Sequence, residues 1–577
     1  MLLAARPLTA ETPVYLQLAP MVSIHASNLS DAIRLLNDGL AGAGQEIQPS
    51  DCAKTLADLC FLPSFDGVDP REPVRYFLLS QNPPVAMPEQ AVILPLRQDG
   101  SKALLRNLRD RYAFVEGGSI KICAEPVDGK SVDPLYVAIA DGNAMLSPNV
   151  DAIRWMAYNL QSKTVPAPPD FRQAPLSASV DSGLLGRLLE IISSSDEEGI
   201  PDEETAGNLF LAVRELGIFL SAFQHVEVTV DATLSQWDAS FRFAGAPGSA
   251  IAEAIAALKP PDDSWMKLFP NYACNRSASC IPGFVSALPA SNRKWLANLA
   301  ADTRIAGFGV IPSAFGIDEK LRPYLSGTAL SAFVADVSDH QFGSITVSAL
   351  KSPEPVLKIL RGCFAANGLA SNNKRITGIA PNDGNGKIAY DTVVDKDVRQ
   401  KTSVGSASEA VSFVLNLNHV ELAVRGNRLF VVRGANGLLD TLLADKDPSN
   451  WNESFSSLTA VFPNQPGETV LGGGSLEPVA LARRIVGAVR DLREHLSKMP
   501  HQGGGCAWRM SRKGGEARFD LRLYSNEIIA CNRLRDVNSE TMQQLLSQLV
   551  MRHFQLSGGN GGQGGKLRGK LNEMRDK

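Results

Sequence analysis

The residues best suited to acid–base chemistry lie in one short stretch, VADVSDHQFGS at residues 334–344. A carboxylate and an imidazole within hydrogen-bond reach can move protons, so Asp336, Asp339 and His340 are the candidates. Neighbouring residues of a strand point to opposite faces, however, so adjacency alone does not make Asp339 and His340 a dyad. None of the seven histidines falls in HExxH or HxH. The sequence therefore predicts no catalytic residue and no metal site.

Two glycine-rich stretches could bind small ions. LGGGSLEP (residues 471–478) places glycines before a helical pattern with Ser475 as its expected N-cap, and anions bind at helix N-termini. It lacks the Lys-Ser/Thr of a P-loop and does not fit GxGxxG. PNDGNGK (residues 381–387) resembles half of a calcium loop, but the glycine and the distal glutamate are out of place for an EF-hand. We interpret both stretches as loops and predict no cofactor.

The eight cysteines contain no CxxC, which argues against a zinc knuckle and a thioredoxin-type redox motif. Cys274 and Cys280 lie in the Pro-flanked stretch NYACNRSASCIPG. We expect this stretch to be a loop that brings the two cysteines within disulfide distance in an oxidising compartment. The alternative is two free buried thiols.

Composition places the chain among globular proteins. Its 577 residues exceed what one core can organise, and it is 44% hydrophobic and 20% charged. The net charge of −4 indicates no particular partner. Aromatic residues make up 7% and do not interleave with basic ones, so nucleic-acid binding is not predicted. No stretch reaches the roughly 20 uninterrupted apolar residues of a membrane helix, so no transmembrane segment is predicted.

The first residues, MLLAARPLTAETPVYL, have an apolar patch and a small residue at Ala10 but no basic region before them. We interpret them as the remnant of an export signal, which predicts a periplasmic or otherwise exported protein. The alternative is a frayed end on a cytoplasmic protein.

Two distant segments share one local design, which predicts an internal duplication. Residues 137–153 and 422–438 each read as an apolar strand, a Gly-Asn pair, a second strand and the start of a helix. Gly142-Asn143 aligns with Gly426-Asn427, and we expect both pairs to form exposed hairpin tips.

Two further matches have the same order in both halves. Leu104 aligns with Val356 on expected helices, and Phe241 aligns with Phe519 on expected strands. The offsets agree if residues 371–403, rich in Asn, Asp, Gly and Lys, are a surface insertion in the second copy.

The predicted fold is therefore α+β, a tandem duplication of a unit with antiparallel sheets covered on one face by helices. We expect the first repeat at residues 11–260 and the second at residues 261–556. Residues 557–577, a glycine-rich segment with a basic end, are expected to be disordered.

The pattern resembles large uncharacterised bacterial envelope proteins grouped as domains of unknown function. The segments that carry this resemblance are YVAIADGNAMLSP and FRFAGAPGSAIAEAIAAL. It implies export, an α+β duplication and the absence of enzymatic activity, and it carries over no catalytic or binding residue.

Three functions remain open at this point. The first is a non-catalytic envelope or periplasmic protein that binds or scaffolds a protein partner, with envelope components as candidates. The second is a carrier of an apolar ligand in a cavity between sheet and helices. The third is a hydrolase of unrecognised type. The sequence does not determine the oligomeric state.

Overall fold

The computed structural model divides the chain into two compact units, Met1–Ala252 (unit 1) and Glu253–Lys577 (unit 2). This boundary lies eight residues before the predicted one (260 − 252). The structure describes residues 13–45, 48–81, 88–115, 120–126, 135–167, 174–194, 223–260, 273–280, 321–336, 341–365, 374–377, 388–394, 419–434, 438–443, 461–463, 465–477, 479–480, 483 and 504–536.

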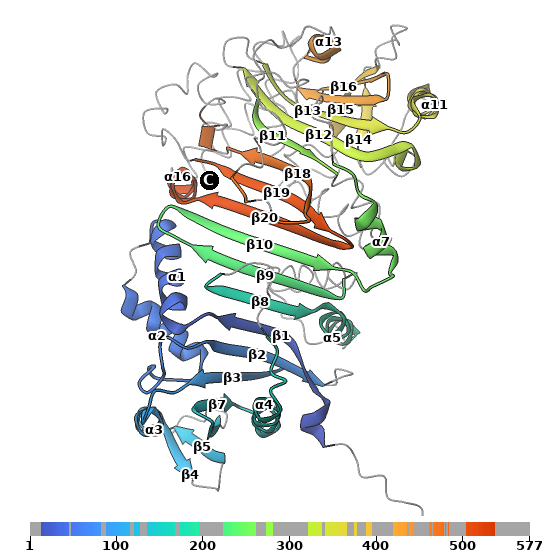
Figure 1. Ribbon diagram of the computed structural model, residues 1–577. Helices are drawn as coiled ribbons and strands as arrows, with labels where there is room; N and C mark the ends of the chain where they lie inside the picture. The colour runs from blue at the N-terminus through green and yellow to red at the C-terminus, as the bar shows by residue number, and fades with distance from the viewer. Residues whose placement is uncertain are drawn as a thin grey trace, which may run out of the picture. The chain divides into compact units, whose positions relative to one another are not determined.

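The described residues of unit 1 form ten antiparallel strands. They pair in the order β10-β9-β8-β1-β2-β3-β7-β6-β5-β4 (Figure 1). The strands are β1 (Leu18–Ala26), β2 (Val74–Gln81), β3 (Glu89–Pro95), β4 (Tyr112–Val115), β5 (Ile120–Pro126), β6 (Leu135–Ala140), β7 (Asn143–Ser147), β8 (Leu176–Asp181), β9 (His225–Ala232) and β10 (Gln236–Ala244). The helices are η1 (Val14–Gln17), α1 (Leu29–Gly42), α2 (Pro49–Leu59), α3 (Gly100–Arg109), α4 (Val150–Ser162) and α5 (Ser182–Ser194), and α7 (Ala250–Ala257) crosses the boundary.

In the part of unit 2 that the structure describes, ten antiparallel strands pair in the order β20-β19-β18-β11-β12-β13-β17-β16-β15-β14. The strands are β11 (Ala273–Ser279), β12 (Leu325–Asp336), β13 (Gln341–Leu350), β14 (Lys374–Thr377), β15 (Ile388–Val394), β16 (His419–Arg425), β17 (Arg428–Gly434), β18 (Thr469–Leu476), β19 (Cys506–Lys513) and β20 (Glu516–Tyr524). The described helices are η5 (Arg322–Tyr324), α11 (Pro353–Ala365), α13 (Leu438–Leu443) and α16 (Ser525–Asp536).

The two strand orders are the same when β1 to β10 are replaced in turn by β11 to β20. Helices α3 and α11 also follow equivalent strands, β3 and β13, and they bury Leu104 and Val356. Phe241 and Phe519 lie in the corresponding last strands. The α+β class is confirmed, and both units repeat one topology. Common descent by duplication stays a prediction.

Both predicted hairpins are present, but the turn in unit 1 begins one residue before the predicted Gly142-Asn143 pair. In unit 1 the two-residue turn is Asp141-Gly142, with φ of 50° and 72°, and Asn143 already begins β7. In unit 2 the turn is Gly426-Asn427. In unit 1, positive φ at both turn residues suits the right-handed twist of the flanking strands, and Asp and Gly tolerate it.

The expected surface insertion at residues 371–403 needs correction. It contains β14 and β15, which occupy the positions of β4 and β5 in the repeated strand order. The extra length is therefore in the connections: residues 395–418 separate β15 from β16, whereas residues 127–134 separate β5 from β6. The predicted tail at 557–577 lies outside the described residues.

Helices cover both faces of the inner strands of unit 1, where the sequence predicted one covered face. On one face, Val92 and Leu94 of β3 pack with Leu104 of α3 and residues of α1 and α2. On the other face, Ile93 of β3 packs with Trp155 of α4. Alternate residues of one strand thus enter two cores. No helix in the described ranges is long and apolar enough to cross a membrane.

Candidate interaction surface

Of the acid–base cluster considered from the sequence, only Asp336 lies among the described residues. Asp336 ends β12 opposite Gln341 of β13, and Asp339 and His340 lie outside the described residues. The possible calcium loop at 381–387 also lies outside them. Across the described ranges, no group of three or more His, Cys, Asp or Glu residues could hold a metal ion.

The expected loop LGGGSLEP is a strand instead. Gly472, Gly473 and Gly474 lie within β18, which pairs with β11 on one side and β19 on the other. Ser475 also belongs to β18, so it is not a helix N-cap. Pairing on both sides overrides the weak strand preference of glycine, and glycines leave space beside large side chains.

The two candidate disulfide cysteines are not brought together. Cys274 lies in β11, and Cys280 follows the last residue of that strand. Extended backbone rises about 3.3 Å per residue, so six residues span roughly 20 Å. A disulfide needs Cα atoms about 4.4–6.8 Å apart. Cys280 is a buried free thiol.

The feature that stands out in unit 1 is an apolar sheet face over its outer strands. One row of cross-strand partners runs from β6 to β10 and is apolar throughout; its members are Val137, Leu146, Val92, Tyr76, Ile24, Ala178, Val228 and Phe241. Its first three members are fully buried beneath helices α1 to α3. The other five are only partly buried. The row is therefore only partly covered from β2 onward.

We call the partly buried half of this surface the outer apolar face. It has three residues from each of four strands, and none of the twelve is polar. They are Val22, Ile24 and Ala26 of β1, Leu176, Ala178 and Val180 of β8, Val226, Val228 and Val230 of β9, and Ala239, Phe241 and Phe243 of β10. Ala26 and Val226 are buried, and the other ten are partly buried.

The opposite side of the same strands is polar and more deeply buried. His25, Ser177, Thr229 and Ser240 form one cross-strand row there, and each is at most 6% exposed. An antiparallel sheet in water normally buries its apolar face and exposes its polar one. In this row the usual burial is reversed: its polar residues are buried, whereas Ile24, Ala178 and Val228 of the neighbouring apolar row are only partly buried.

His25 shows what this reversal does to a titratable group. Burial and, to a smaller extent, the neighbouring Arg75 guanidinium together lower its pKa to about 4. Its ring lies edge-on against Phe77, with centroids 6.0 Å apart, and its Nε2 has no hydrogen-bond partner. His25 is therefore neutral at pH 7.

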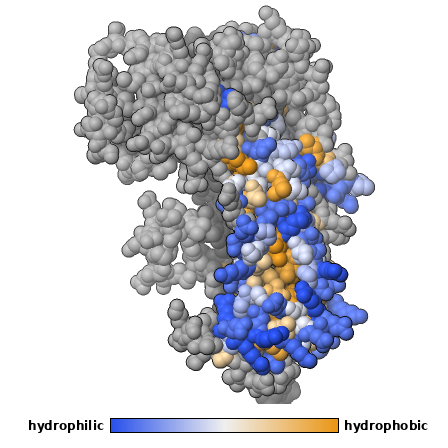
Figure 2. All heavy atoms as spheres, turned by 90° about the vertical axis from the view of Figure 1, so that its left-hand side faces the viewer, coloured by the Kyte–Doolittle hydropathy of each residue, from blue (hydrophilic) through white to orange (hydrophobic). Residues whose placement is uncertain are grey.

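Helices α1 and α5 lie over opposite ends of the outer apolar face. At the β9–β10 turn, Gly39 of α1 lies so close to Trp237 that a Cβ there would be 2.9 Å from the indole ring. At the other end, Leu184 and Leu188 of α5 pack near Val22. Figure 2 shows hydrophobic side chains gathered in a stripe between hydrophilic ones on the side of unit 1 that carries α1 and α2.

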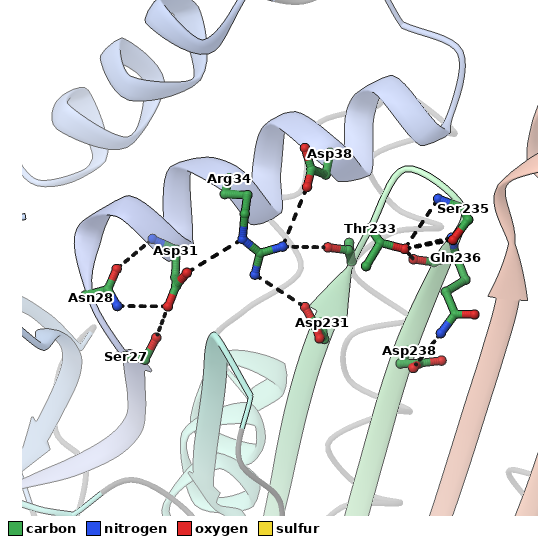
Figure 3. Close-up of polar contacts among 11 residues, drawn as sticks. Ser27, Asn28, Asp31, Arg34, Asp38, Asp231, Thr233, Ser235, Gln236 and Asp238 are labelled. Atoms are coloured by element: carbon green, nitrogen blue, oxygen red, sulfur yellow. Dashed lines mark hydrogen bonds and ion pairs between the residues drawn. The ribbon is translucent and has the colours of Figure 1, made fainter. Parts of the chain in front are cut away.

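An acidic cluster joins α1 to the edge of this face (Figure 3). Arg34 Nη1 donates a hydrogen bond to the carbonyl oxygen of Ala232 at 3.2 Å. The guanidinium also lies 3.6 Å from Asp31, 3.6 Å from Asp38 and 3.7 Å from Asp231. Three carboxylates surround one guanidinium, so the cluster carries a net charge of about −2 at neutral pH. We call these four residues the acidic rim.

The start of α1 is fixed by a separate capping arrangement. The Asn28 side-chain oxygen accepts a hydrogen bond from the backbone N–H of Asp31 at 2.7 Å. Asn28 Nδ2 and Ser27 Oγ both donate to the Asp31 carboxylate. Capping satisfies helix N–H groups that have no partner within the helix, and it holds Asp31 toward Arg34.

Unit 2 shows the same reversal in its outer strands. Trp508 and Phe519 stack on one face with ring centroids 5.6 Å apart, and both are partly buried. On the other face, Arg509 is fully buried and contacts Asp520 at 2.6 Å. Arg518 contacts Asp520 and Glu468, both at 2.9 Å. The four charges balance, as buried ions require.

A small pocket in unit 1 lies away from the outer apolar face. Its lining includes Leu18, Leu79, Glu89 and Asn149, and it holds about 40 Å³. That volume suits water, whereas pockets for organic ligands enclose about 300–1,000 Å³. This pocket therefore does not support a carrier function.

The sequence of β9 carries a signal for the outer apolar face. HVEVTVDA of β9 alternates apolar and polar residues, which predicts a strand with one apolar face. Alternation identifies the two faces but not which one is buried, because that depends on elements distant in sequence.

No family model and no curated protein matches the chain. Three solved structures, crystal forms I, III and IV of TP0453, match with sequence identities of 10%, 8% and 10% and TM-scores of 0.21, 0.21 and 0.23. The alignments cover 40–41% of this chain and 79–80% of the matched chains. At these values the likeness carries no argument about function.

Proposed function

We propose that this protein is a non-catalytic binding or scaffolding protein and that the outer apolar face is its binding surface. One observation carries the proposal: twelve apolar residues form a continuous face, of which ten are only partly buried. Contiguous exposed apolar surface marks sites of interaction. Completing the burial of each partly buried valine or phenylalanine would contribute on the order of 1 kcal/mol.

The proposal includes export to the periplasm or envelope and a protein partner. The apolar patch at the N-terminus of the sequence and the resemblance to envelope proteins support export. The sheet geometry supports a protein partner, because sheet faces are normally covered by helices or by another sheet.

A hydrophobic fluorescent dye, anilinonaphthalene sulfonate, tests the surface. The native protein should bind it, and Val228→Gln should remove most of the signal because Val228 lies mid-face on β9. Leu234→Gln is the matched control, since Leu234 is 65% exposed in the β9–β10 turn, outside the face.

Circular dichroism should show that both variants fold. The milder pair Val228→Thr and Val230→Thr, which keeps side-chain shape, replaces Val228→Gln if that variant is unstable. Equal dye binding by all folded proteins would contradict the proposal.

A further inference from the structure

The outer apolar face has the dimensions of one short helix. Its four strands span about 14 Å at roughly 4.8 Å per strand spacing, and its three rows span about 13 Å along the strands. A helix is about 10 Å wide and rises about 1.5 Å per residue, so about three turns would cross the four strands.

Helices already cover the buried part of the same surface. Val137, Leu146 and Val92 pack beneath α1 to α3, and Ile24, Ala178 and Val228 continue their row across the sheet. Among the described elements, α1 lies over the β9–β10 turn end of the outer part and α5 lies over its Val22 end. The row of Ile24, Ala178 and Val228 between them is only partly buried. Because helices cover the inner half of this row, a helix is also the element that fits its outer half.

The charge of the acidic rim indicates the charge expected on the polar side of the bound partner. The acidic rim carries three carboxylates against one guanidinium, and its four side chains are 21–41% exposed. A cationic partner gains from this rim, whereas an anionic lipid headgroup is repelled.

From these three observations we infer that the occupant is a cationic amphipathic helix of a partner protein, which lies across β1, β8, β9 and β10 with lysine or arginine toward the acidic rim. This inference rests on the proposed function and names its partner class. The apolar residues of the partner helix pack on the face at helical spacing.

Two synthetic peptides test this inference. Both are 18-residue helices with leucine on one face; one carries lysine on the other face and the second carries glutamate. Fluorescence anisotropy with the full chain should show the lysine peptide binding about tenfold tighter, because a few rim ion pairs contribute about 0.2–1 kcal/mol each. Raising the salt concentration should reduce this preference.

Variants separate the face from the rim. Val228→Gln should weaken binding of both peptides, while Leu234→Gln should not. The double variant Asp38→Asn with Asp231→Asn should bring the two peptides within about threefold of each other. Asp58→Asn is the control, because Asp58 forms an exposed ion pair with Arg111 outside the rim.

The outcomes distinguish this inference from the proposed function. If both peptides bind equally and only Val228→Gln weakens them, the face is a binding surface but its partner is not cationic. If neither peptide binds, while phosphatidylglycerol vesicles bind in a Val228-dependent manner, the partner is a lipid and the inference is overturned. If Val228→Gln does not weaken peptide binding, both the inference and the proposed function are overturned.

Discussion

At the scale of single residues, β9 shows how neighbouring side chains meet opposite environments. Val228 lies on the outer apolar face and is partly buried, whereas Thr229 is 1% exposed and its hydroxyl has no hydrogen-bond partner. A buried polar atom without a partner costs free energy, so other contacts must offset the burial of the Thr229 hydroxyl.

His25 predicts how stability depends on pH. Its pKa in the folded protein is lowered to about 4, so the unfolded chain takes up a proton near pH 6.5 before the folded protein does. Stability is therefore lost as pH falls from about 6.5 to about 4, by roughly 3 kcal/mol in total from this group. Urea unfolding of the wild type and His25→Leu at pH 7 and pH 4.5 should show a smaller loss in the variant. An equal loss of stability in the wild type and the variant would contradict this role of His25. His225→Gln, at an exposed position, is the control.

The burial of Cys280 predicts how its thiol reacts with an alkylating reagent. Burial raises the pKa of Cys280 to about 12, and it raises the pKa of Cys60 to about 12 as well. Because the thiolate is the reactive form, native protein at pH 8 should leave both thiols unmodified by iodoacetamide, while denatured protein should be alkylated at both. A Cys274–Cys280 disulfide peptide in the mass spectrum would contradict the geometry of β11.

At the scale of elements, helix α3 depends on a close backbone approach. A Cβ on Gly100 would lie 2.1 Å from the carbonyl oxygen of Gly67, and Gly67 itself has φ of +93°. Gly100→Ala should therefore lower the free energy of unfolding by about 1–3 kcal/mol, because backbone must move to admit the methyl group. Ser101→Ala, one residue along the helix, should have a much smaller effect. The urea midpoints of the two variants are compared. Equal midpoints would show that the backbone at Gly67 moves at little cost in free energy.

The β9–β10 hairpin and helix α1 are in direct contact. Arg34 reaches the end of β9, and Gly39 admits Trp237 of β10 against the helix. This arrangement places the acidic rim at one edge of the outer apolar face. A partner helix would therefore meet charge and apolar surface from the same few elements.

At the scale of the whole molecule, unit 1 has its own cores, which predicts independent folding. The three hydrophobic clusters described in unit 1 contain only residues before 190. A fragment ending at Pro260, after α7, should therefore fold and melt cooperatively. Circular dichroism and thermal melting test this, and a fragment without a cooperative transition would show that unit 1 requires unit 2. Equivalent behaviour of unit 2 alone would support the duplication.

Sequence patterns were sufficient where local rules dominate. HVEVTVDA alternates apolar and polar residues as strand β9 requires, GLLGRLLEIISS has the apolar spacing of helix α5, and Gly514-Gly515 forms the two-residue turn between β19 and β20. Each depends on side-chain period or on the turn chemistry of a few adjacent residues. The α+β class followed from the same signals.

Long-range pairing decided the rest. Gly472 to Gly474 became a central strand because β11 and β19, distant in sequence, pair with it on both sides. Residues 374–394 became part of the sheet rather than an insertion for the same reason. The sequence by itself determined which residues of β9 share a face. Only the tertiary structure decided that the polar face is buried and the apolar face left partly open, because burial depends on which other elements pack against each side.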